Sequence, residues 1–168
     1  PATKDIAKLK DTPWDANVNL RTVQLSFDRS CNFSCSYCNP TYSTSWGKDI
    51  EKHGPYQKFK TLTAGAYQQD GSWADPENKY IDSNPYVDAF MRWWPDLSKD
   101  LQTLRITGGE PSTSPNFWKF LDMIRTNPVP HLNLSVNSNL GVKDGLIDKL
   151  IETTNVLELG SYDIYTSN

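Results

Sequence analysis

The three cysteines of this chain, Cys31, Cys35 and Cys38, lie within one run of eight residues. Their spacing, C-x3-C-x2-C, supplies three soft thiolate ligands from a single short loop, and an aromatic residue, Tyr37, stands directly before the last of them. A structural zinc ion or an ordinary electron-transfer iron–sulfur cluster takes four protein ligands. Three thiolates would instead leave one iron of a [4Fe–4S] cluster open to another molecule. We therefore expect a metal centre with one coordination position kept for a ligand.

Two other interpretations of the cysteines have to be weighed. A zinc site would need a fourth donor, for which the sequence offers His53, His131 or a carboxylate. His131 begins an expected strand and so belongs at the edge of the sheet that does not bind ligands, whereas His53 lies in a long insert and stays a candidate. Free cysteines also serve as small buried hydrophobic residues, but a loop rich in Asn and Ser is a poor core segment.

A second polar loop, Gly108-Gly109-Glu110-Pro111, follows a strand-like segment. Taken alone it is a weak signal, because paired glycines are common in turns and glutamate is usually a solvated charge. Glycines also let the backbone approach a ligand closely and present carbonyl oxygens to it. Together with the negative charge of Glu110, these carbonyls would suit an ammonium group.

A third polar loop is Asn137-Ser138-Asn139, which fits a capped turn or a binding role equally well. Tyr37 has two interpretations as well, packing against its own loop or excluding water from a cluster. Neither histidine has a nearby Ser or Asp pattern of the kind that a hydrolytic triad needs. The sequence therefore offers ligands for a cofactor but no acid, base or nucleophile that we would name as catalytic.

Strand-like alternation precedes each of these loops, at residues 22–26, 103–107 and 132–136, and a last strand is expected within 161–167. Three helices with one apolar face are expected between them. They run from Asn84-Pro85 to near Pro95, from Ser114-Pro115 to Asn127-Pro128, and around 146–151, with Trp93, Trp94 and Trp118 in the core. Residues 156–159 fit either the end of the third helix or the start of the last strand.

Residues 41–84 are expected to form a long irregular insert, because glycines and prolines interrupt the pattern of apolar residues before a helical or strand period is sustained. Its many aromatic residues argue against disorder. Loops of this length are usually functional, so the insert is expected to shield the cluster or bind substrate. Residues 1–19 form a polar lead-in segment to which we assign no chemistry.

Strands that alternate with helices predict a parallel α/β sheet joined by right-handed crossovers. Ligands of such sheets gather at the carboxyl ends of the strands. All three polar loops follow strands and therefore belong at this one edge. Their convergence is stronger evidence for a binding site than any one of the motifs.

Length and composition limit the classes of protein and partner that have to be considered. The chain has 168 residues, enough for one domain with a real core, and its formal charge is −3, with 17 Lys and Arg against 20 Asp and Glu. No basic stripe favours nucleic acid or an anionic membrane, and no apolar run approaches the roughly 20 residues that span a bilayer. Reduced thiols and the lack of a secretory signal favour the cytoplasm. The start at Pro1 and the end just after a strand-like stretch predict an incomplete chain.

The cysteine loop, followed about 70 residues later by a strand and Gly108-Gly109-Glu110-Pro111, resembles the radical S-adenosylmethionine superfamily. More narrowly, the chain looks like the uncharacterised twitch-domain radical proteins. The segments that carry this likeness are Cys38-Asn39-Pro40, the aromatic insert, 84–95, 105–111 and Tyr165-Thr166-Ser167. The resemblance covers residues 20–168 and implies a partial (βα)6 barrel, of which four parallel strands are present and the rest is missing.

The resemblance implies that Cys31, Cys35 and Cys38 bind a [4Fe–4S] cluster whose open iron is chelated by S-adenosylmethionine. By position, Gly108, Gly109 and Glu110 would then receive the amino group of the methionine moiety, and the Tyr37 backbone would approach the adenine. Ser138, Asn139 and Ser167 would contact the carboxylate or the ribose. The implied activity is reductive cleavage of S-adenosylmethionine to a 5′-deoxyadenosyl radical, which takes hydrogen from an unknown substrate. A flavodoxin or ferredoxin would supply the electron.

The chain also departs from the family pattern. The later adenine-binding strands have no counterpart, and three cysteines are too few for the additional cluster of a twitch region, which would follow Asn168. The alternative function from another class is a zinc-stabilised protein-binding module that uses Cys31, Cys35, Cys38 and His53.

Overall fold

The computed structural model describes Ile6 and residues 10–16, 18–59, 64–68 and 84–166. Of the residues singled out above, Ser167 lies outside the described residues, as do residues 1–5, 7–9 and 17 of the lead-in segment and residues 60–63 and 69–83 of the insert.

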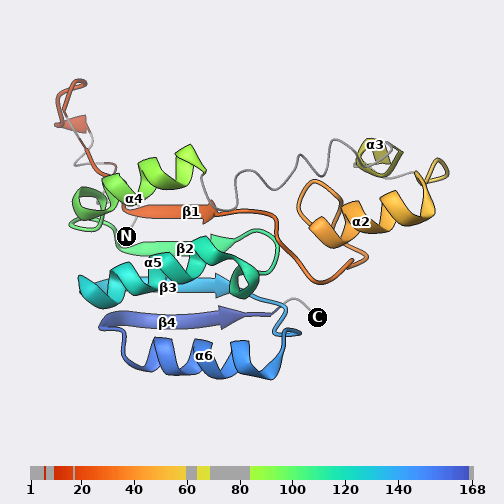
Figure 1. Cartoon of the computed structure of the whole chain (residues 1–168). Coiled ribbons are helices and arrows are strands. Elements are labelled where there is room, and N and C mark those ends of the chain that lie inside the picture. The colour runs from red at the N-terminus through yellow and green to blue at the C-terminus, as the bar shows by residue number, and fades with distance from the viewer. Residues whose placement is uncertain (1–5, 7–9, 17, 60–63, 69–83, 167–168) are drawn as a thin grey trace.

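Four parallel strands form a single sheet in the order β1-β2-β3-β4, which is also their order in the chain. The strands are β1 (Thr22–Ser26), β2 (Thr103–Thr107), β3 (Val129–Asn137) and β4 (Leu159–Tyr165). All four arrowheads in Figure 1 point the same way. The predicted α/β class with four parallel strands is thus confirmed. Residues 156–158 connect α6 to β4, and only Leu159 of the ambiguous stretch joins the strand.

The third strand is longer than the sequence pattern indicated and begins at Val129 rather than Leu132. Its buried residues are Val129, Leu132, Leu134 and Val136, so the alternation slips by one residue near Pro130. The pairing with β4 also shifts register between Val129 and Asn133. Such an irregularity accommodates an extra residue, and it hid the start of this strand from a search for strict period-two alternation.

Helices α4 (Pro85–Leu97), α5 (Pro115–Thr126) and α6 (Asp144–Asn155) connect the strands and run along the sheet (Figure 1). The Asn84 side chain accepts from the Tyr86 N–H, and Ser114 accepts from the Phe117 N–H, so the two predicted helix starts are confirmed. Helix α4 does not end near Pro95 as expected. It continues to Leu97 because the Ser98 N–H still bonds to the carbonyl of Trp94.

The insert 41–84 is less irregular than expected, because it contains α2 (Thr44–His53) and α3 (Ala64–Gln68). Ser43 caps α2 by accepting from the Trp46 N–H, and Gly54 ends it with a positive φ of 87°. Only Gly47 and Ile50 are buried in α2, so no apolar stripe marks it in the sequence. Both helices lie beyond the arrowhead of β1 in Figure 1.

The hydrophobic core lies between one face of the sheet and helices α4, α5 and α6. It centres on Phe27, Phe90, Trp94 and Phe120, whose rings contact one another with centroids 4.8 to 6.1 Å apart. Trp93, which we expected in the core, is 42% exposed because it points off the apolar face of α4. In the described ranges, no helix has the length and apolar character that crossing a membrane requires.

Candidate functional site

The cysteine loop and the two polar loops that follow β2 and β3 meet at the carboxyl edge of the sheet. They enclose a cavity of about 120 Å³. Its lining contains all three cysteines together with residues of both other loops: Cys31, Phe33, Cys35, Tyr37, Cys38, Tyr42, Thr107, Gly108, Gly109, Asn137, Ser138 and Asn139. The structure therefore brings together most of the site residues that the sequence indicated.

The start of α2 holds the first cysteine in place. The Thr44 hydroxyl accepts from the Cys31 N–H at 3.0 Å and lies 3.1 Å from the Cys31 carbonyl, which also accepts from the Ser45 hydroxyl at 2.8 Å. In addition, the Thr44 N–H donates to the carbonyl of Arg29. These short polar contacts fix the backbone of Cys31 without using its thiol.

Aromatic residues of the insert hold the other two cysteines. The indole N–H of Trp46 donates to the carbonyl of Cys35 at 2.9 Å, and the hydroxyl of Tyr67 donates to the carbonyl of Cys38. The rings of Trp46 and Tyr67 meet edge to face, 5.2 Å apart. Sequence reasoning missed this role, although the aromatic content of the insert was the signal for an ordered structure around the cysteines.

The thiols lie on a partly buried surface, and Cys31, Cys35 and Cys38 are all free. Burial raises the pKa of Cys38, and the charges of the neighbouring Cys31 and Cys35 raise it further, against a lowering effect of the backbone at Asn39. A metal that binds here would therefore displace a proton.

Among the residues that the structure describes, no three side chains of His, Cys, Asp or Glu converge on a point where they could ligate one metal ion. Each thiolate of an iron–sulfur cube binds a different iron, so the three thiolates need to surround a cavity rather than meet at one point. Three thiols around one cavity, with no carboxylate or imidazole among the lining residues, are a donor set that fits such a cube.

Gly108 and Gly109 allow the loop after β2 to pack against residues 26–30, the segment between β1 and the cysteine loop. Gly108 has a positive φ of 116°, and a Cβ there would lie 2.2 Å from the Ser26 hydroxyl. At Gly109 a Cβ would lie 2.1 Å from the carbonyl oxygen of Ser30, which accepts from the Glu110 N–H at 2.6 Å. The glycines are therefore required for a close backbone–backbone approach as well as for access to the cavity.

Glu110 is 1% exposed and joins the second loop to the third. One carboxylate oxygen accepts from the N–H and hydroxyl of Ser112 at 3.1 and 2.6 Å and from the Ser138 hydroxyl at 2.8 Å. The other accepts from the Asn139 N–H at 2.7 Å. Glu110 does not line the cavity of the cysteines. The structure thus pairs this carboxylate with donors inside the protein, whereas the sequence suggested it as an acceptor for an ammonium group.

The third loop is fixed to the other two by the same kind of contacts. Asn139 donates from its side-chain amide to the Asn32 side chain at 3.0 Å, and its side-chain oxygen accepts from the Gly141 N–H at 2.8 Å. A Cβ at Gly141 would lie 2.2 Å from the ring of Phe33, so a larger residue there would displace that ring of the cysteine loop. Ser138 and Asn139 therefore have structural roles and also line the cavity.

Tyr37 lines the cavity but is 66% exposed, which does not support packing against its own loop. Two further aromatic residues, Phe33 and Tyr42, also line the cavity, and no periodic pattern indicated either of them. Together these three rings form an apolar rim.

Neither histidine joins the cysteines. His53 ends α2, has a side chain 52% exposed and lies 3.9 Å from Asp49, and it is absent from the cavity lining. The Nε2 atom of His131 lies 2.9 Å from the carbonyl of Ser98, and the residue borders a hollow with Arg21 and Gln102, which precede β1 and β2. His131 is thus away from the carboxyl edge of the sheet, as expected.

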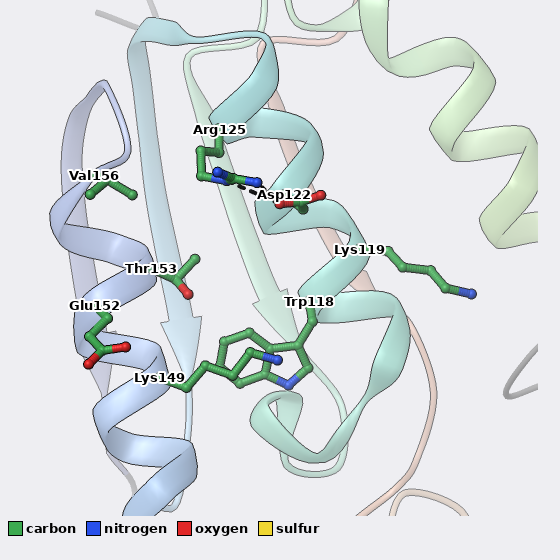
Figure 2. Close-up of a pocket in the computed structure, with 8 residues that line it drawn as sticks. All are labelled: Trp118, Lys119, Asp122, Arg125, Lys149, Glu152, Thr153 and Val156. Carbon is green, nitrogen blue, oxygen red and sulfur yellow. Dashed lines mark hydrogen bonds and ion pairs between the residues drawn. The ribbon is translucent and has the colours of Figure 1, made fainter.

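A larger hollow of about 480 Å³ lies between α5 and α6 (Figure 2). The Nζ atom of Lys149 stands 4.1 Å from the centre of the Trp118 ring, and Arg125 pairs with Asp122. In Figure 2 the Lys119 side chain points away from the hollow. No cysteine, histidine or strand end borders this hollow. The smaller cavity at the strand ends is therefore the candidate site.

Comparison with known protein families, with curated proteins and with solved structures finds no match to this chain.

Proposed function

We propose that this chain is the core of a radical S-adenosylmethionine enzyme, in which the four strands form part of a (βα)6 barrel. The observation that carries the proposal is the cavity at the carboxyl edge of the sheet, where three cysteines from one loop face the glycine loop after β2 and the polar loop after β3. A cytoplasmic location and an electron donor of the flavodoxin or ferredoxin kind belong to the same proposal.

In this proposal the thiolates of Cys31, Cys35 and Cys38 hold a [4Fe–4S] cluster and leave one iron for S-adenosylmethionine. When bound, the reduced cluster and S-adenosylmethionine supply a 5′-deoxyadenosyl radical that removes a hydrogen atom from the substrate. The cysteine loop is prepared for its role by hydrogen bonds to its backbone from Thr44, Ser45, Trp46 and Tyr67, which leave the thiols available.

The residues on the opposite side of the cavity would bind S-adenosylmethionine. Backbone groups of Gly108 and Gly109 line the cavity and are assigned to the amino group, whereas Ser138 and Asn139 are assigned to the carboxylate or ribose. The Glu110 carboxylate lies outside the cavity lining and already accepts four hydrogen bonds, from Ser112, Ser138 and Asn139. We therefore propose that the main role of Glu110 is to position the loops that follow β2 and β3. The aromatic rim of Phe33, Tyr37 and Tyr42 would exclude water.

Anaerobic reconstitution with iron and sulfide tests the proposal. The wild-type chain should turn brown, bind about four irons and four sulfides, and change its spectrum when S-adenosylmethionine is added. After reduction with dithionite it should release 5′-deoxyadenosine. Cys38→Ala should lose most of the cluster, because the remaining two thiolates hold it poorly.

The variant His53→Ala separates this proposal from the zinc-stabilised module, because only a zinc site that uses His53 would be lost with it. We expect His53→Ala to load iron as the wild type does. A colourless wild-type protein that binds one zinc ion, and loses it in His53→Ala, would contradict the proposed function.

A further inference from the structure

The face of the sheet that does not pack against the helices is polar along all four strands. The register aligns its residues in three rows that cross the sheet. The middle row consists of Gln24, Arg105, Ser135 and Asp163, of which Gln24, Arg105 and Asp163 are exposed. The flanking residues are neutral and polar: Thr22, Thr103, Asn133 and Ser161 form one row, and the pairs Ser26–Thr107 and Asn137–Tyr165 lie on the other side of the middle row. A sheet face of this composition is suited to a polar ligand rather than to a hydrophobic core.

Arg105 is the one cation in these three rows, and the protein holds it in a defined orientation. Its Nε–H donates to the side-chain oxygen of Asn137 at 3.1 Å, and its guanidinium carbon lies 5.9 Å from the centre of the Tyr165 ring. The hydrogen bond to Asn137 uses Nε and not the two terminal amino groups of the guanidinium. Among the described residues, no carboxylate forms an ion pair with Arg105.

Asp163 is the one anion of the same rows, and Ser135 on β3 separates it from Arg105. Two strand spacings correspond to roughly 10 Å between the two backbone positions. Arg105 and Asp163 therefore present opposite charges on one open surface instead of neutralising each other.

The same surface leads directly to the cavity of the cysteines. Arg105 stands two residues before Thr107 on β2, a distance of roughly 7 Å along the strand, and Thr107 lines the cavity. Asn137, which accepts the hydrogen bond from Arg105, lines the cavity as well. A molecule bound at Arg105 would thus have its other end at the candidate site.

We propose that Arg105 is a specificity-determining residue that binds the carboxylate or phosphate group of a small polar substrate. The planar fork of its terminal amino groups matches two anionic oxygens, and Asn137 and Tyr165 hold the fork in place. Asp163 offers an acceptor for a hydroxyl or ammonium group of the same molecule. That the bound molecule is the substrate of a radical reaction rests on the proposed function, whereas the anion site itself does not.

The probes for this site are benzoate and phenylphosphate, with benzamide as the neutral counterpart of benzoate. Each is titrated into the full chain while the arginine Nε–H signals are followed by nuclear magnetic resonance, and the signal of Arg105 is identified by its loss in Arg105→Lys. At least one anion should shift this signal, and benzamide should not. In Arg105→Gln the affinity for that anion should fall roughly tenfold or more, since hydrogen bonds to charged groups are lost.

The control variant is Arg92→Gln, which removes the same charge from an exposed position of α4 and should leave the anion affinity unchanged. Arg105→Lys keeps the charge without the fork and should bind with intermediate affinity. The proposal is overturned if neither anion shifts the Arg105 signal, if benzamide binds as well as benzoate, or if Arg105→Gln and Arg92→Gln weaken binding equally.

S-adenosylmethionine also carries a carboxylate, so its response is measured in reconstituted Arg105→Gln. We expect the spectral change on adding S-adenosylmethionine to be retained, and its loss would overturn the assignment of Arg105 to a substrate. The two proposals fail separately. A wild-type chain that binds no iron but binds anions at Arg105 would refute only the proposed function, whereas iron loading without an anion site would refute only this inference.

Discussion

The Glu110 carboxylate accepts hydrogen bonds from residues two, 28 and 29 positions further along the chain. All of its partners are N–H or O–H donors, so a charged carboxylate satisfies them where a neutral amide would not. Buried hydrogen bonds to charged groups are among the stronger ones in proteins. The residue that the sequence offered as a ligand for an ammonium group is therefore, first, the connection between two loops of the site.

Glu110→Gln should lower the free energy of unfolding by about 1–3 kcal/mol, because the new side-chain NH2 group faces donors instead of acceptors. Urea denaturation measures this change. Glu158→Gln is the matched control, since Glu158 is exposed and should tolerate the same substitution almost without effect. Equal stability of both variants would contradict a structural role, and would favour direct binding of a ligand by Glu110.

At the scale of elements, α2 and the cysteine loop form one unit. The helix begins where the Thr44 hydroxyl meets both the N–H and the carbonyl of Cys31, and Trp46, one turn or less from the start, reaches the carbonyl of Cys35. The aromatic residues that follow, Tyr56, Phe59 and Tyr67, contact one another and Trp46, with Tyr56 and Phe59 stacked and the other ring pairs edge to face. The insert therefore supports the cysteines from outside the sheet.

Thr44→Val keeps the shape of the side chain and removes its hydrogen bonds to Cys31. We expect faster hydrogen exchange at the Cys31 amide, unchanged exchange in β2 and β3, and a lower iron content after reconstitution. Thr153→Val on α6, far from the cysteine loop in the chain, is the control and should change none of the three. If Thr44→Val exchanges and loads iron like the wild type, α2 does not hold the loop.

At the scale of the whole molecule, two aromatic groups have different tasks. The sheet core contains Phe120, which is fully buried among Phe27, Phe90 and Trp94. The group in the insert contains Phe59, which is 39% exposed and contacts Tyr56 and Tyr67. The first group holds the helices on the sheet. The second group holds together the part of the insert whose side chains contact the cysteine loop.

Phe120→Ala should lower the free energy of unfolding by roughly 3–5 kcal/mol, as expected for a large side chain deleted from a packed core. Phe59→Ala should cost clearly less in urea denaturation, because part of its ring is already in water, but it should reduce the iron content after reconstitution. Equal losses of stability in the two variants would show that the insert and the sheet form one core.

The sequence was sufficient for the order of the four strands and of α4, α5 and α6, because periods of two and 3.6 residues and the residues that cap helices are local properties of the chain. It also placed the three polar loops at one edge, since parallel strands must share their carboxyl ends. It failed for α2, where capping by Ser43 and contacts to Cys31 replace the apolar stripe, and for β3, where the irregularity near Pro130 interrupts the alternation.

Only the tertiary structure decided what the residues of the site contact. Whether Gly109 faces a ligand or the carbonyl of Ser30, and whether Glu110 points outward or joins two loops, depends on segments far apart in the sequence. The same is true of Arg105, which reads as an ordinary residue of a strand until the register places it beside Asn137 and Tyr165 on an open polar face. Local patterns specify elements, whereas the partners of a side chain are set by how those elements pack.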